Sequence, residues 1–201
     1  MKKIAPVLPL LGVIAFIIAY FYATSIYPGG TKFDHSAPGY DHLLNFWCDL
    51  LMPVAYSGEP NPGYTIALIA TMGLTASLLF FWYFITLLFL DQKLKVIIVR
   101  ITGCLSMFLT MFVFSSIHDA LVLLASFFGF IAFGIVLTEF LKKKEILLFA
   151  TTLITVACAL VAVLLWQVNL LPLWTPISEK IAFISFFMWV WLIVIRYIRV
   201  L

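Results

Sequence analysis

The stretch ILLFATTLITVACALVAVLLWQVNLL, from Ile146 to Leu171, decides the fold class of this chain. It contains 26 residues and no Asp, Glu, Lys or Arg. Its apolar residues are continuous rather than alternating, and about 20 helical residues suffice to cross the hydrocarbon core of a bilayer. The sequence therefore predicts a membrane-spanning α-helix here.

The rest of the chain has the same character. Of its 201 residues 65% are hydrophobic and 10% are charged, whereas a soluble domain has roughly 25% charged residues to cover its surface. The sequence therefore predicts an all-α, polytopic integral membrane protein, a six-helix bundle in which residues 1–201 form a single domain. The expected spans are Ile4–Tyr27, Tyr64–Leu90, Ile101–Ile117, Ala120–Leu141, Ile146–Leu171 and Ile177–Ile195.

The positions of the cations predict how the spans are oriented. Ten of the 12 Lys and Arg residues lie before the first span, between spans two and three, between spans four and five, or after the last span, and only Lys32 and Lys180 lie on the other side. Because cytoplasmic loops carry the excess of Lys and Arg, both termini are expected in the cytoplasm. The net charge of +3, without a basic stripe along any helix, argues against nucleic acid as a partner.

The one long loop, residues 28–63, would then lie outside. Within it, Tyr40–Met52 places its polar residues on a helical arc of about 120°, opposite an apolar face, which predicts an amphipathic helix at the outer interface. The residues on the polar arc are Asp41, His42, Asn45, Cys48 and Asp49. Two orientations stay open: the apolar face rests in lipid with the polar face in water, or the polar face points inward over a cavity.

A second outer polar cluster, Ser115 to Asp119, connects the third and fourth spans. Ser116 and Asp119 have the spacing of a helix start, and Asp119 suits the positive end of the fourth helix, so capping is one interpretation of the cluster. His118 is not needed for capping. Since both clusters should lie at one membrane depth, we expect Asp49 and His118 within direct or one-water hydrogen-bond reach, with Asn45 nearby.

The outer side also carries all three histidines and most of the carboxylates. His with Asp is a ligand set for zinc and a general acid–base set, but no metal-binding spacing is present, so no cofactor is predicted and zinc is kept as the alternative. No ionisable residue lies near the middle of any span, which disfavours a proton pump or an ion-coupled transporter. The candidate ligand-binding residues are Asp41, His42, Asn45, Asp49, Ser116, His118 and Asp119; Asp49 and His118 are the catalytic candidates, and His42, Asp49 and His118 the metal candidates.

Short motifs in the two clusters carry a family resemblance. They are Tyr40, Asn45, Phe46, Asp49 and Leu50 after the first span, then Ser116 and His118 before the fourth. With six spans, they resemble bacterial membrane proteins of the domain-of-unknown-function 998 type, which are distantly similar to DRAM/FRAG-like eukaryotic membrane proteins. That family commonly has Ser before the Asp, where this chain has Cys48. The resemblance implies the six-helix fold, a place in the bacterial inner membrane and a pairing of Asp49 with His118, and it implies no reaction.

Two functions follow as hypotheses. The leading one is non-catalytic: binding of a lipid or small amphiphile at the outer leaflet, or support of a membrane-protein partner. The alternative rests on a weaker resemblance to the ceramidase-like membrane hydrolases and is a metal-dependent lipid hydrolase that uses Asp49, His118, His42 and Asp119. Membrane lipids are partners in both hypotheses.

Overall fold

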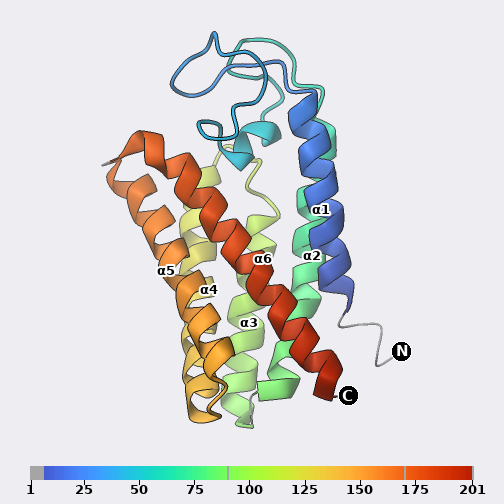
Figure 1. The fold of residues 1–201 in the computed structure, drawn as a ribbon, viewed down its shortest axis with the longest axis vertical. Helices are drawn as coiled ribbons and strands as arrows, with labels where there is room; N and C mark the ends of the chain where they lie inside the picture. The colour runs from blue at the N-terminus through green and yellow to red at the C-terminus, as the bar shows by residue number, and fades with distance from the viewer. Residues whose placement is uncertain (1–6, 90, 170, 201) are drawn as a thin grey trace.

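The computed structural model describes residues 7–89, 91–169 and 171–200, and these form an all-α bundle (Figure 1). The start of the first predicted span, with Lys2 and Lys3, lies outside the described residues, as does Leu90. The long helices are α1 (Leu8–Ser25), α2 (Tyr64–Phe89), α3 (Lys93–Thr110), α4 (His118–Lys142), α5 (Ile146–Val168) and α6 (Thr175–Val200), with short 3-10 helices η2 (Trp47–Leu51) and η3 (Pro172–Trp174).

Each long helix packs against the next one in the chain, and α6 also contacts α1, which closes the bundle. Four of the five connections are short, and short connections make neighbouring helices antiparallel. The exception is the long loop between α1 and α2, which lies over one end of the bundle together with η2 (Figure 1). We call this end the outer end and the opposite one the inner end.

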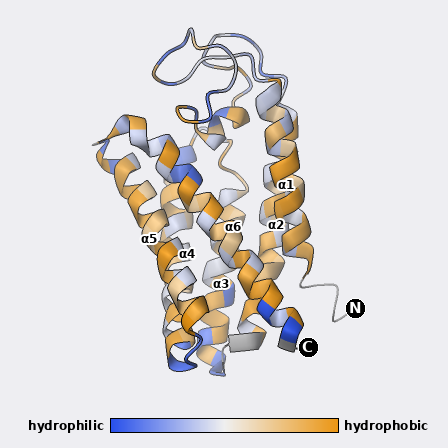
Figure 2. Cartoon of the chain, in the orientation of Figure 1, coloured by the Kyte–Doolittle hydropathy of each residue, from blue (hydrophilic) through white to orange (hydrophobic). Residues whose placement is uncertain are grey.

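Five of the helices are long and apolar enough to cross a membrane: α1, α2, α4, α5 and α6. Large apolar side chains are exposed on the outward faces, such as Ile18 (66%), Ile69 (66%) and Leu147 (65%). Figure 2 shows this apolar character along the helices, with hydrophilic residues gathered at the helix ends and in the outer loop. Such a surface requires lipid rather than water, which indicates a multi-pass membrane protein.

The third predicted span was displaced along the chain. Helix α3 begins at Lys93 and ends at Thr110, whereas the apolar run predicted Ile101–Ile117. Lys and Arg are good helix formers whose long side chains reach polar partners, so the helix includes them. Arg100, for example, donates through Nε to Oγ1 of Thr86 at 2.9 Å and stacks 4.0 Å from the ring of Tyr83.

Ion pairs join the helix ends at the inner end of the bundle. Lys95 on α3 pairs with Glu139 on α4 at 2.5 Å, and Arg196 on α6 pairs with Glu145 at the start of α5 at 2.6 Å. Lys143 likewise pairs with Asp91 at 3.1 Å. The described cations that the sequence places on one side of the membrane therefore gather at one end of the fold.

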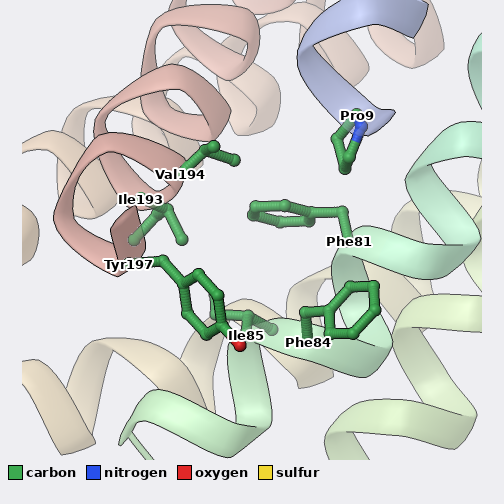
Figure 3. A pocket seen from close by; sticks show the side chains of 7 residues that line it. All are labelled: Pro9, Phe81, Phe84, Ile85, Ile193, Val194 and Tyr197. Carbon is green, nitrogen blue, oxygen red and sulfur yellow. The ribbon is translucent and has the colours of Figure 1, made fainter. Parts of the chain in front are cut away.

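Aromatic side chains fill the bundle core towards the inner end. Trp82 and Trp189 are 1% and 0% exposed, and Nε1 of Trp189 donates to Oγ1 of Thr152 at 2.8 Å. Gly103 lets α3 approach the indole of Trp82, since a Cβ there would lie 2.4 Å from a ring carbon. A hollow of about 10 Å³ beside this core holds no more than one water (Figure 3). It is lined by Pro9, Phe81, Phe84, Ile85, Ile193, Val194 and Tyr197.

Candidate functional site

The predicted amphipathic helix over Tyr40–Met52 is wrong. Residues 42–44 form a turn, Phe46 is extended, and only Trp47–Leu51 is helical, as the 3-10 helix η2. The cause is local, because Asp41 Oδ1 accepts hydrogen bonds from the amides of Leu43 (2.8 Å) and Leu44 (3.1 Å). Side-chain acceptors of this kind compete with the helical hydrogen-bond ladder and favour turns.

Two of the polar residues nevertheless point inward. Asn45 is fully buried and Asp49 is 2% exposed. Asn45 Nδ2 donates to Gly30 O (3.0 Å) and to Asp49 Oδ2 (2.9 Å), and its Oδ1 accepts from the amide of Asp41 (2.9 Å). Asp49 Oδ2 also accepts from the amide of Phe46 at 2.8 Å. Asn45 and Asp49 therefore hold the loop in its folded shape.

Burial raises the pKa of the Asp49 carboxyl, although the hydrogen bonds from Asn45 and Phe46 and the charges of Lys180 and Lys32 act in the opposite direction. His42, by contrast, is exposed and packs against the rings of Phe21 and Tyr40. The polar arc predicted as one face is thus divided between the interior and the surface.

The loop inserts Trp47 between α1 and α6. Its ring stacks on Phe183 at a centroid distance of 4.7 Å and lies 4.7 Å from Tyr20 and 5.4 Å from Phe16. Tyr20 donates a hydrogen bond to the hydroxyl of Tyr40 at 3.0 Å. An aromatic wedge of this kind contributes buried area and ring contacts that hold the loop against both helices.

Two charged residues of α6 contact the loop, and neither was predicted as a site residue from the sequence. Glu179 Oε2 accepts from the amide of Trp47 at 3.0 Å. Lys180 Nζ donates to the carbonyl oxygens of Asn45 and Pro176. Their position in the sequence could have indicated a role. They are a carboxylate and a cation within the sixth predicted span, where ionisable residues usually have a function. Figure 2 shows this hydrophilic turn of α6 beside the outer loop.

His118 begins α4, as the second cluster predicted for that helix start, but its partners differ from those expected. Its Nδ1 lies 2.9 Å from Asp119 Oδ1, and its ring lies 5.9 Å from that of Trp166. Asp49 and His118, which were expected to pair, do not form a direct hydrogen bond. Asp49 instead accepts at Oδ2 from Asn45 Nδ2 and from Phe46 N, both within its own loop.

The predicted capping by Ser116 is also wrong. The residue before α4 is Ile117, no side chain in the described part of the chain caps the helix, and Ser116 is exposed. Asp119 does lie in the first turn of α4, where its charge favours the helix dipole.

The metal candidates do not converge. Among the described residues, no three His, Cys, Asp or Glu side chains lie close enough together to hold a metal ion. His42 lies on the surface, while Asp49 and His118 have separate partners. The donor set that the hydrolase alternative requires is therefore not assembled in this fold.

The main feature near these residues is a cavity of about 320 Å³ inside the bundle, to which all six long helices and η2 contribute. Most of its lining is apolar, with aromatic rings at the outer end: Phe16, Tyr20, Phe46, Trp47, Trp166 and Phe183. Glu179 and His118 line it as well. Such a volume is typical of a small-molecule site with few polar groups.

Trp166 illustrates how the cavity differs from the sequence-based expectation. Tryptophans near span ends usually anchor a helix at the membrane interface, yet Trp166 lines the cavity and meets the ring of Phe46 edge-on at 5.2 Å. Cys48 also lines the cavity, and burial raises the pKa of its thiol, so it adds no charge there.

Comparisons with known proteins identified no relative of this chain. No family model, no curated protein and no solved structure matches the chain. The resemblance to proteins of the domain-of-unknown-function 998 type, carried by the residues named above, stays a prediction.

Proposed function

We propose that this chain is a six-span protein of the bacterial inner membrane that binds a lipid or small amphiphile in its outer-end cavity and catalyses no reaction. The observation that carries the proposal is the cavity itself, about 320 Å³ in volume and largely apolar, with Glu179 and His118 among its lining. An engineered cavity of roughly 150 Å³ lined by apolar side chains already binds benzene. A cavity twice that size has room for part of an alkyl chain.

The polar groups support an amphiphile rather than a pure hydrocarbon. Glu179 is held by the amide of Trp47, and His118 lies against Trp166, whose ring in turn contacts Phe46. These contacts place the two polar residues at the loop-covered end of the cavity. A head group would therefore lie at the outer end, with its chain directed towards the bundle centre.

The six-span topology belongs to the same proposal. With its 18 residues, α3 is about 27 Å long, and it packs between α2 and α4, both of which are apolar enough to span. Its cations lie in the half near the inner end, where such side chains reach the head groups. Assignment of that end to the cytoplasm places both termini there, as the distribution of Lys and Arg predicts.

Equilibrium binding tests the proposal. Purified full-length protein in nanodiscs is titrated with tritiated dodecanol, and protein-free nanodiscs give the background from partitioning into lipid. We expect saturable binding, because the cavity offers a limited number of places whereas the bilayer does not. An absence of saturable binding would refute the proposed function.

Two alanines of α5 give a matched pair of variants. Ala162 lines the cavity, whereas Ala157 is exposed on the outward face. Ala162→Phe should weaken saturable dodecanol binding because the ring takes up part of the cavity. Ala157→Phe adds the same ring towards lipid and should bind as the wild type does.

A further inference from the structure

The hydrogen-bonding character of the cavity points to the chemical class of its ligand. Glu179 uses Oε2 to accept from the amide of Trp47, and no described residue donates to its Oε1. This carboxylate lines the cavity, and a carboxylate oxygen only accepts hydrogen bonds. An occupant that brings a donor to Oε1 would satisfy an acceptor that the protein leaves open.

His118 also lines the cavity. Its Nδ1 lies 2.9 Å from Asp119 Oδ1, and its Nε2 makes no hydrogen bond to a described residue. A neutral imidazole that donates from Nδ1 to this carboxylate has Nε2 as an acceptor.

The charges around the cavity favour a cationic donor. Among the described residues that line the cavity, Glu179 is the only one of the types Asp, Glu, Lys and Arg. Lys180 does not line the cavity, and its ammonium is directed to the carbonyl oxygens of Asn45 and Pro176. Lys32 does not line the cavity either, and its Nζ lies 5.4 Å from the ring centroid of Trp166.

The aromatic wall has the matching chemistry. Ring faces attract an ammonium group within about 6 Å, and the attraction strengthens away from water. Trp47, whose backbone amide donates to Glu179, and its stacking partner Phe183 both line the cavity with their rings. The apolar remainder of the cavity would accommodate the alkyl chain attached to the ammonium group.

We infer that the cavity selects a single-chain amphiphile with an ammonium head group, recognised by Glu179 together with the surrounding aromatic rings. This inference rests on the proposed function and specifies its ligand class. A neutral alcohol of the same chain length would fit the cavity but would lack the charge-assisted hydrogen bond, and a carboxylate of that length would be repelled by Glu179.

Displacement of tritiated dodecanol from the full-length protein in nanodiscs tests the inference. Unlabelled dodecylamine, dodecanol and dodecanoate are the competitors. We expect dodecylamine to compete at least tenfold better than dodecanol, and dodecanoate to compete worst. Equal competition by amine and alcohol, or preference for dodecanoate, would overturn the inference.

Variants of Glu179 then identify the recognising group. Glu179→Gln should reduce the preference for amine over alcohol to within about twofold, because a neutral amide replaces the carboxylate. Glu179→Asp keeps the charge and should keep a preference. Since the ratio is measured within each protein, changes in overall affinity or partitioning cancel. A full amine preference in Glu179→Gln would also overturn the inference.

The two proposals fail separately. If the wild type shows no saturable site for dodecanol, the proposed function is refuted. If the site is present but shows no amine preference, only the ligand class is refuted. The competition series on the wild type alone decides the ligand class should Glu179→Gln fail to fold.

Discussion

Replacement of Asn45 by Ala tests whether one buried amide organises the outer loop. Asn45 is fully buried and makes three hydrogen bonds, to Gly30 O, to Asp49 Oδ2 and from the amide of Asp41. The variant removes all three and leaves a buried carbonyl, a buried carboxylate and an amide each short of one partner. Each lost bond costs about 1 kcal/mol, the low end for a group left unsatisfied. The folded loop therefore loses about 3 kcal/mol of stability relative to the locally unfolded loop.

Hydrogen exchange followed by mass spectrometry measures this loss directly. The amides of Asn45, Asp49 and Met52 are hydrogen-bonded within the loop, to Asp41 O, Phe46 O and Asp49 O. A loss of about 3 kcal/mol lowers their protection by about a hundredfold, while amides of α4 should stay protected. Leu43→Ala is the control, because Leu43 lies in the same turn and is 62% exposed. Protection that is the same in both variants would refute the role assigned to Asn45.

Three further predictions concern pH, packing and topology. Burial raises the pKa of Asp49 above its ordinary value of 3.8, so the folded loop binds that proton more tightly than the locally unfolded loop does. Hydrogen-exchange protection of the loop, corrected for intrinsic exchange, should therefore fall as pH rises from about 4 to the raised pKa and then level off. Asp49→Asn should remove this pH dependence. Gly103→Ala should lower the free energy of unfolding by about 1–3 kcal/mol in a denaturant titration, since its Cβ would meet an indole carbon at 2.4 Å; Gly73→Ala, whose Cβ meets nothing within 4 Å, should not, and equal losses would contradict the packing. In a cysteine-free background an impermeant thiol reagent should label Glu59→Cys but not Lys143→Cys in intact cells, and labelling of the latter would overturn the orientation.

The helices themselves were largely predictable, since uncharged runs of this length have few alternatives in lipid. The second, fourth and fifth predicted spans agree with α2, α4 and α5 to within a few residues. Helix α3 begins and ends earlier in the chain than the third predicted span. Hydropathy alone excludes cations from a span, although cations such as Lys95 can lie in the helix and pair with a partner such as Glu139. Periodicity also failed for the outer loop, because a 100° pattern over three turns is equally compatible with a turn followed by a short 3-10 helix.

Fold class was thus determined by the sequence alone: a backbone in lipid must satisfy its own hydrogen bonds, and continuous apolar runs leave the α-helix as the way to do so. The conformation of the outer loop and the composition of the cavity were decided by tertiary structure. Trp47 and Glu179 are 132 residues apart in the chain, and their hydrogen bond exists only because α6 returns beside α1. No local pattern encodes that return, since it depends on how six apolar surfaces pack against one another and on which buried polar groups must then find partners.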